Sequence, residues 1–454
     1  MSRKLSRREM LKGLGITALA ASLYACQPKQ EAPAEEPKAE QPKEESKQQP
    51  VDKEKPTLRL TLWAEQSGEG RTWPQDKGLE WAEQTGIADV EVELVSYNEM
   101  PTKQLTAVAA GTLWDVMFNN NKIGPYNAFK GVYLWLDDLI NAYSTDMTDY
   151  FPAAVEGSAF EGKQYGLPCE TNTGNTNIVF YNKDLLAEFG VDEPTDDWTF
   201  QEFSEMSAKA TDKDRRIFGT NLLFGNYYDF AALARGFGGD LFSEDGKDFT
   251  LTTDDKTYEA MKAFVELRTK HEAAPTRDES EGLNFYVGQL AIRPWGTYGF
   301  VQTEINVEDK FEWGACLGPT GPDGMRGYSL FILQQVVGST TEHPEEAFQL
   351  CAHLCSQEVA MWSFINQGQP TARLSVLRSP EAEEQSPVLA RVADWMADGV
   401  NSGPFPQPWN LRFQEVQDTW NNLSLELQYG EAPFEEAAEN VQIECQKVME
   451  IERG

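Results

Sequence analysis

Histidine and catalytic sequence signatures are scarce in this chain. Only three of its 454 residues are histidines, which leaves little material for imidazole acid–base chemistry. The sequence contains no Gly-x-Ser-x-Gly elbow, no His-Glu-x-x-His motif, no P-loop and no Gly-x-Gly-x-x-Gly turn. Its 73 carboxylates are too many for any one glycosidase-like pair to be informative. We therefore predict that the protein is not an enzyme and uses no cofactor.

Cysteine is also scarce, with six residues in the chain. One of these, Cys26, ends the N-terminal apolar run, which leaves an odd number: Cys169, Cys316, Cys351, Cys355 and Cys445. Cys351 and Cys355 flank His353 in the sequence, which could suggest a metal site. On a helix, however, the two cysteines share one face while His353 points about 200° away from it. We predict no metal site and small, buried, apolar cysteines. Whether any of them form disulfides stays open.

Positive charge is in short supply, since the formal net charge is −34. Nucleic acid and anionic membrane surfaces would be repelled by such a chain, so neither is expected as a partner. The acidic surface also disfavours a polyanionic ligand unless a local basic pocket overrides it. Its ordinary effect is to maintain solubility.

Long hydrophobic runs are absent, and the N-terminal apolar stretch from Gly13 to Ala25 is short. It has roughly a dozen residues against the ~20 needed to cross a membrane. With a charged start and a small residue before Cys26, it is typical of an export signal over residues 1–25. Arg7-Arg8 followed by Leu11-Lys12 resembles a twin-arginine signal, and Leu23-Tyr-Ala-Cys26 resembles a lipobox, which predicts lipidation of Cys26. The alternative is an ordinary secretory signal with a chance cysteine.

The segment after Cys26 lacks aromatic residues. Gln27 to Pro56 is composed mainly of Lys, Glu, Gln, Ala and Pro, with Val51 as its one larger aliphatic residue. Such a sequence buries too little apolar surface to offset its ordering entropy. We predict that residues 26–56 form a lipidated, disordered tether, which leaves about 400 residues for two lobes or domains.

The remaining sequence alternates strand and helix patterns. Strands are expected at Thr57–Trp63, Val90–Val95, Trp114–Phe118, Ile178–Tyr181, Leu290–Ile292 and Ser329–Leu333. One helix is expected to include Leu79 and Trp81, a second to span Met100–Ala110 and a third to end near Gly190. Another should begin with Thr199 as its N-cap, a further helical stretch should span Pro344–Phe364, and the chain from Leu411 onward should be helical. This order predicts an α/β fold with a parallel sheet covered by helices.

Several polar and aromatic residues follow the predicted strands. Ligands in parallel α/β sheets sit beyond the carboxyl ends of the strands, which places Trp63 to Glu65 and Asn119 to Asn121 on one rim. Aromatic residues in loops beside Gly, Asn or Thr include Trp63, Tyr227, Tyr228, Trp295, Tyr298, Tyr328 and Trp409. Aromatic planes stack on the C–H face of a sugar ring while polar side chains bind its hydroxyls. Each of these residues could instead serve packing alone.

The chain resembles the extracellular solute-binding proteins of ABC transporters, family 1, which include the maltose-binding proteins. Seven segments carry the resemblance in the expected order: Phe160–Pro168, Val179–Leu185 with Gly190, Trp198–Phe203, Phe285–Ile292 with Trp295-Gly296, Trp313-Gly314, Pro319–Pro322 and His343–Ala347. The resemblance implies a two-lobed periplasmic-binding-protein fold of type II, with a hinge between the lobes. One lobe would comprise residues 57–170 and 325–370, and the other residues 171–324 and 371–454.

The resemblance also implies where the chain crosses and where a ligand binds. Crossovers are expected near Glu170–Asn177, Tyr328–Gln335 and Gln367–Arg373. Carried over by position, the ligand contacts would be Trp63, Glu65, Asn119, Asn120, Glu170, Asn172, Tyr228, Trp295, Tyr298, Tyr328, Arg373 and Trp409. Among these we expect Trp295 to be the stacking platform and Glu170 a hydroxyl acceptor.

Together these features predict a lipid-anchored binding protein on the extracytoplasmic face of the cell membrane. It would be a monomer that captures a mono- to oligosaccharide and delivers it to the permease subunits of an ABC importer. Two alternatives remain open: the same fold binding a polyol, phosphodiester or peptide-like solute, and a surface-anchored glycan-degrading enzyme.

Overall fold

The computed structural model describes residues 55–64, 72–173, 177–221, 227–297, 299–385, 387–397 and 411–451. The predicted signal, Cys26 and the greater part of the predicted tether lie outside these residues. No helix within the described ranges is both long enough and apolar enough to span a bilayer. The five cysteines from Cys169 onward are buried free thiols, as predicted for small apolar residues. The described residues hold no cluster of His, Cys, Asp or Glu suited to a metal ion.

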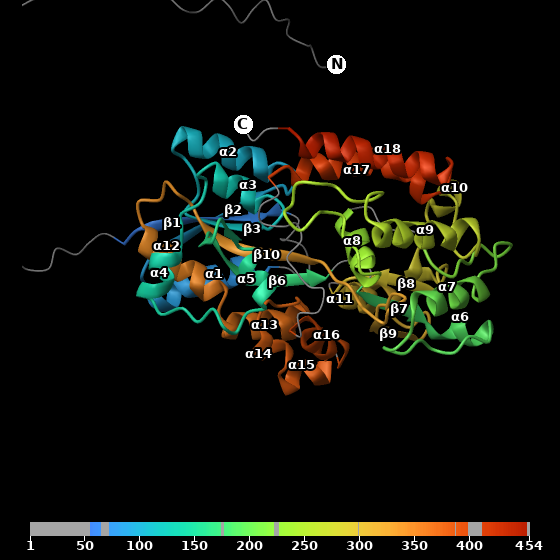
Figure 1. Ribbon diagram of the computed structural model, residues 1–454. Coiled ribbons are helices and arrows are strands. Elements are labelled where there is room, and N and C mark those ends of the chain that lie inside the picture. The colour runs from blue at the N-terminus through green and yellow to red at the C-terminus, as the bar shows by residue number, and fades with distance from the viewer. Residues whose placement is uncertain are drawn as a thin grey trace, which may run out of the picture. The chain divides into compact units, whose positions relative to one another are not determined.

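A five-stranded sheet forms the first half of the fold, in the order β2-β1-β3-β10-β6 (Figure 1). Its strands are β1 (Thr57–Trp63), β2 (Asp89–Val95), β3 (Val116–Asn120), β6 (Gly166–Thr173) and β10 (Leu330–Val337). β1, β2 and β3 are parallel, as predicted, but β10 runs antiparallel to both β3 and β6. The sheet is therefore mixed: the chain forms much of the second half of the fold between β6 and β10, and β10 then returns in the opposite direction.

Helices cover both faces of this first sheet. On one face lie α1 (Trp73–Thr85) and α12 (Pro344–Leu354). Gly78 allows α1 to approach closely, since a Cβ there would lie 3.0 Å from Cδ2 of Leu60. Successive strand residues point to opposite faces, so Asn119 lies on the other face, where it contacts Gln104 of α2 (Met100–Ala110). The remaining elements of this half are α3 (Gly124–Phe129), α4 (Asp137–Ala142), α5 (Pro152–Glu156), β4 (Ala159–Phe160), β5 (Lys163–Gln164) and α13 (Gln357–Gln367).

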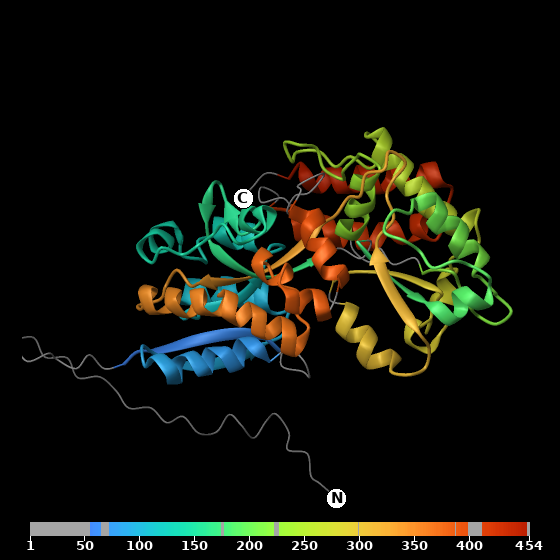
Figure 2. The same ribbon diagram turned by 90° about the horizontal axis from the view of Figure 1, so that it is seen from below.

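A second, antiparallel sheet has the order β8-β7-β9, with β7 (Ile178–Asn182), β8 (Ile292–Trp295) and β9 (Trp313–Leu317). Its accompanying elements are α6 (Lys183–Glu188), α7 (Phe200–Lys209), α8 (Tyr227–Gly236), α9 (Asp255–Thr269), α10 (Arg277–Ser280), the 3-10 turn η2 (Phe285–Val287) and α11 (Gly299–Val307). The C-terminal helices are α14 (Leu374–Leu377), α15 (Pro380–Gln385), α16 (Pro387–Ala397), α17 (Phe413–Gln428) and α18 (Phe434–Met449). Helix α17 packs against α8 and α9, and α18 packs against α17; the two C-terminal helices are red in Figure 2.

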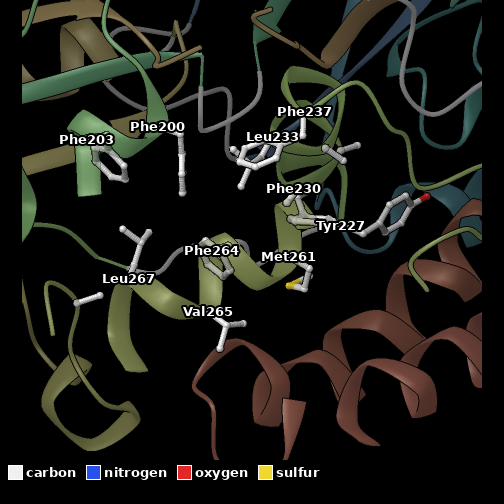
Figure 3. Close-up of a cluster of buried hydrophobic side chains, with 14 of the residues drawn as sticks. Phe200, Phe203, Tyr227, Phe230, Leu233, Phe237, Met261, Phe264, Val265 and Leu267 are labelled. Carbon is white, nitrogen blue, oxygen red and sulfur yellow. The ribbon is translucent and has the colours of Figure 1, made fainter. Parts of the chain in front are cut away.

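The core of this second half is strongly aromatic. Side chains from α7, α8 and α9 converge there, and Met261 and Val265 point toward the C-terminal helices (Figure 3). A separate cluster fills the first half around β1 and β3. A third joins the two sheets through Ile332 of β10, Phe180 of β7 and Phe364 of α13. The junction between the sheets is thus a packed apolar contact as well as a chain crossing.

Two predicted elements differ from the structure for identifiable reasons. The single helix over Pro344–Phe364 is wrong: α12 ends at Leu354, and Ser356 caps a new helix by accepting a 3.2 Å hydrogen bond from the Val359 amide. The strand over Leu290–Ile292 is also wrong, since β8 begins at Ile292 and runs through Pro294 to Trp295. Because β8 is an edge strand, a proline that lacks an N–H is tolerated there.

The predicted cap at Thr199 is confirmed, and it allows a stability prediction. Thr199 and Glu202 form a reciprocal capping box at the start of α7. Thr199→Ala should lower the free energy of unfolding by about 1 kcal/mol, because the Glu202 amide loses its acceptor. Chemical denaturation followed by circular dichroism measures this change. Thr199→Ser keeps the hydroxyl and should match the parent; equal losses in both variants would contradict the capping explanation.

Candidate functional site

A cavity of about 680 Å³ lies at the carboxyl ends of the parallel strands β1, β2 and β3. This volume is within the range of small-molecule binding sites. Its walls come from the strand ends, from α2 and α3, and from α17 of the second half: Trp63, Tyr97, Asn98, Met100, Pro101, Thr102, Leu105, Asn120, Lys122, Ile123, Tyr126, Asn127, Leu411, Gln414, Glu415 and Gln417. The cavity therefore lies between the two halves of the fold.

Trp63 and Asn120, both predicted from the sequence, meet at this cavity. The ring of Trp63 packs edge-on against Tyr97 and Phe118, each with a centroid separation of 4.9 Å. These contacts fix the indole, and its Nε1 has no hydrogen-bond partner among the described residues. A buried N–H donor without a partner costs free energy unless a ligand or water accepts from it.

Asn120 contacts two other residues of the cavity wall, Lys122 and Tyr97. Its Oδ1 accepts a 2.9 Å hydrogen bond from the Lys122 amide. Burial raises the pKa of Tyr97 to about 12, and the hydrogen bond with Asn120 opposes that rise. The tyrosine therefore keeps its hydroxyl proton at physiological pH and presents a neutral polar group.

Asn119 lies behind the cavity wall, although it was predicted as a ligand contact. Its Nδ2 donates to Tyr133 and, at 3.3 Å, to Gln104 Oε1. Asn127 donates to the same two groups at 3.0 and 2.6 Å. This buried polar cluster joins β3 to α2 and α3. Asn119 thus supports the wall that Asn127 lines and does not itself line the cavity.

The other predicted residues that are described lie away from the cavity lining. Glu170 is buried on β6, where its Oε1 accepts a 2.6 Å hydrogen bond from Trp73 Nε1. Asn172 follows on the same strand, with its Oδ1 buried and unpartnered among the described residues. Tyr328 is enclosed in the cluster that joins the two sheets. These positions place them in or beside the region where the chain crosses between sheets.

Trp295 and Arg373 are each engaged by neighbouring protein groups. Arg293 lies over the ring of Trp295, and Tyr286 packs at 5.9 Å from it. Arg373 donates to the Cys355 carbonyl at 2.8 Å and to the Tyr150 hydroxyl at 2.7 Å, and forms a 3.2 Å ion pair with Asp149. Arg373 is thereby built into the junction after α13.

Four predicted contacts cannot be located in the structure. Glu65, Tyr298 and Trp409 lie outside the described residues, as does the lipidation site Cys26. Tyr228 lies in the first turn of α8, and its side chain is likewise outside the described part of the chain.

Sequence reasoning missed Tyr97, Lys122, Tyr126 and the residues of α17. Tyr97 follows β2, so the rule applied to the other two strands would have found it. The residues of α17 carry no comparable signal, because only the tertiary fold brings Gln414 and Glu415 to this rim. Glu415 accepts two 3.0 Å hydrogen bonds from Arg412, which neutralises much of its charge.

Lys122 supplies a titratable group to the cavity. Burial lowers its pKa to about 8, and attraction to the buried Asp229 of α8 opposes that fall. An unfolded lysine titrates near 10.4. Between about pH 8 and 10, Lys122 therefore carries a proton in the unfolded chain that it lacks in the folded protein. The free energy of unfolding rises with pH across this range, and the gain is lost as the pH falls back to about 8.

This linkage predicts that Lys122→Met removes part of the increase in unfolding free energy between about pH 8 and 10. Urea denaturation at several pH values would measure it. Lys103→Met, at a lysine 48% exposed on α2, is the matched control and should retain the slope of the parent. Identical slopes for the parent and Lys122→Met would contradict the assignment.

A second cavity, of about 40 Å³, lies among α7, α8 and α9 and is lined mainly by apolar groups such as Phe203, Leu233 and Phe264. It is large enough for water but too small for a solute. Only the larger of these two cavities suits a small-molecule ligand.

Comparison with known proteins gives a consistent result. Residues 64–361 match the family described as bacterial extracellular solute-binding protein. The chain is 24% identical over 330 residues to the diacetylchitobiose binding protein DasA of Streptomyces coelicolor, covering 70% of this chain and 72% of that protein.

Two solved structures share the fold. An ABC substrate-binding protein from Listeria monocytogenes in complex with cycloalternan has a TM-score of 0.74 at 22% identity, covering 88% of this chain and all of that one (100%). The maltose-bound MalE3 of T. maritima has a TM-score of 0.69 at 21% identity, covering 86% and 99%. These likenesses confirm the predicted α/β periplasmic-binding-protein fold.

Proposed function

Because this chain belongs to the family of bacterial extracellular solute-binding proteins, we propose that it captures a carbohydrate and delivers it to an ABC importer. The observation that carries the proposal is the 680 Å³ cavity between the two halves of the fold. The similar proteins described above bind diacetylchitobiose, cycloalternan and maltose, which supports the choice of carbohydrate.

The cavity walls have the chemistry that a sugar requires. Trp63, Tyr97 and Tyr126 supply aromatic surface, which packs on the C–H face of a pyranose ring. Asn98, Asn120, Gln414 and Gln417 supply amide groups for the hydroxyl rim. Hydrogen-bonding groups beside an aromatic platform select a polar ring over a simple apolar solute.

We propose that binding works by closure of two lobes, with the lobes bounded as expected above: 57–170 with 325–370, and 171–324 with 371–454. A ligand that contacts the first lobe through Trp63 and the second through α17 binds the closed state better than the open one. It shifts the equilibrium by no more than that difference in affinity. Capture in this mechanism requires no covalent chemistry.

The predicted contacts divide into three groups under this proposal. Trp63 and Asn120 contact the ligand directly, and Glu65, Tyr228, Tyr298 and Trp409 remain proposed contacts beside them. Glu170, Asn172, Tyr328 and Arg373 are proposed to contact the ligand from the crossovers, with Glu170 as a hydroxyl acceptor. Trp295 is proposed to stack on the ligand only if Arg293 moves from its ring.

We further propose that Cys26 carries a lipid after export by the twin-arginine route, with residues 26–56 as a flexible tether. The protein would then lie at the extracytoplasmic face of the cell membrane as a monomer. A tether of this kind raises its concentration near the permease subunits, which receive the ligand. Metabolic labelling with a radioactive fatty acid tests this directly, since Cys26→Ala should abolish incorporation.

Isothermal titration calorimetry against a panel of neutral oligosaccharides tests the main proposal. Maltooligosaccharides and chitooligosaccharides from the disaccharide to the heptasaccharide are suitable probes. We expect saturable binding with no new product by mass spectrometry. The absence of binding heat across the panel would contradict the carbohydrate assignment, and product formation would favour the enzyme alternative.

A further inference from the structure

Exposed aromatic side chains lead away from the mouth of the cavity along the first half of the fold. Tyr126 lines the cavity and is 37% exposed, and Phe129 is 42% exposed. The two residues are three positions apart on α3, so they lie on the same face of that helix. The apolar surface that begins inside the cavity thus continues outside it.

A series of side-chain and strand contacts links Phe129 to a third exposed aromatic residue, Trp135. Phe129 packs edge-on against the buried Phe160 of β4 at a centroid distance of 6.4 Å. β4 pairs with β5, which places Phe160 opposite Lys163. The Nζ of Lys163 lies 5.5 Å from the ring of Trp135, which is 36% exposed. We call Tyr126, Phe129 and Trp135 the aromatic row.

Each member of the aromatic row has an ammonium group beside it. The Nζ of Lys130 lies 5.5 Å from the Tyr126 ring and 5.3 Å from the Phe129 ring, and Lys163 accompanies Trp135. Aromatic surface flanked by N–H donors is suited to sugars, whose rings combine a C–H face with hydroxyl acceptors. The chain has a net charge of −34, so a surface on which lysine ammonium groups accompany each aromatic ring differs from its acidic composition.

Continuity with the cavity distinguishes the row from other exposed aromatic residues. Single exposed aromatic side chains are ordinary on protein surfaces. Tyr143 is one example: it is 41% exposed and packs on Phe348 of α12, on the opposite face of the first sheet from α2. The row begins at Tyr126 of the cavity wall, so one extended ligand molecule can contact both.

We propose that the aromatic row is an outer subsite for the distal units of an oligosaccharide whose first units occupy the cavity. This rests on the proposed carbohydrate function and deepens it, because it identifies the ligand as a chain that extends beyond the cavity rather than a monosaccharide or a compact disaccharide. Distal units would stack on Phe129 and Trp135, while Lys130 and Lys163 donate to their hydroxyl groups.

Calorimetry along an oligosaccharide series tests the outer subsite on the full chain. The probes are maltooligosaccharides and chitooligosaccharides from disaccharide to heptasaccharide, using whichever series binds. For the parent protein, we expect affinity to keep increasing with length after the cavity is filled. Phe129→Ala and Trp135→Ala should each reduce heptasaccharide affinity about three- to tenfold, as expected for loss of one aromatic contact. Neither should change disaccharide affinity by more than about twofold.

Tyr143→Ala is the matched control and should leave every length unaffected. Equal affinity of the parent for the disaccharide and heptasaccharide would overturn the outer subsite while leaving the carbohydrate function intact. Equal weakening of both lengths by Phe129→Ala and Trp135→Ala would also overturn it, since that pattern indicates a change in the fold. Normal ligand affinity at all lengths with impaired uptake in cells would assign the row to contact with the permease instead. No binding heat in either series would contradict the carbohydrate function itself.

Discussion

Trp63→Ala is expected to weaken ligand binding about 30- to 150-fold, which corresponds to about 2–3 kcal/mol. Trp63 is 4% exposed and forms part of the cavity wall, where Tyr97 and Phe118 hold its ring edge-on. A rigid aromatic residue at the centre of a binding site contributes most because little conformational entropy is lost on binding. Calorimetry with the tightest-binding oligosaccharide of the panel measures the loss.

Because Trp63 also packs against the core, a second variant separates binding from folding. Trp63→Phe keeps an aromatic ring but removes Nε1, which has no partner among the described residues. Its removal should therefore cost little stability, yet weaken binding about fivefold if the ligand accepts from that N–H. Trp73→Phe is the comparison: Nε1 of Trp73 donates to the buried Glu170, so this variant should lower stability. Unchanged affinity in both Trp63 variants would remove Trp63 from the site.

Trp420→Ala should lower the free energy of unfolding by about 3–5 kcal/mol, the cost of deleting a large buried aromatic side chain. Trp420 is fully buried on α17 and stacks on Phe230 of α8 at 5.8 Å. Tyr227 and Phe249 contact its edges at 6.5 and 6.3 Å. Its removal leaves a cavity where α17 joins the second half of the fold.

The same substitution should also reduce ligand affinity, because α17 carries Gln414 and Gln417 to the cavity. Thermal and chemical denaturation measure the stability change, and calorimetry at low temperature measures the affinity change. Leu425→Ala, at a residue 37% exposed on the same helix, should change stability by less than about 0.5 kcal/mol. A Trp420 variant as stable as that control would contradict the packing assigned to α17.

Local sequence pattern was sufficient for much of the fold and insufficient for its connections. The alternation in Thr57–Trp63 and the helical stretch Met100–Ala110 matched β1 and α2 at both ends. The antiparallel direction of β10 was not predictable, because strand direction depends on the route of the chain and not on the residues of the strand. The break at Ser356 was missed because a cap within a continuous apolar pattern is easily read as helix interior.

The candidate site was predictable only where a general rule applied. Trp63 and Asn120 are the last residues of parallel strands, and ligands bind at such carboxyl ends. Asn119 does not line the cavity, because adjacent strand residues point to opposite faces and the sequence did not show which face was open. The contribution of α17 depends on packing between segments roughly 300 residues apart, for which one sequence contains no pattern.

The position of β10 in the first sheet determines when that sheet can form. β10 lies between β3 and β6, pairing Leu333 with both Asn120 and Glu170. All three strands of the second sheet precede β10 in the chain, so a growing polypeptide cannot complete its first sheet until every strand of the second sheet has been synthesised. Contacts this distant in sequence slow folding and prolong exposure of unpaired strand edges. If the chain were secreted unfolded, this slow pairing of β10 would have to occur outside the membrane. An export route that carries folded proteins would allow the sheet to form in the cytoplasm before export.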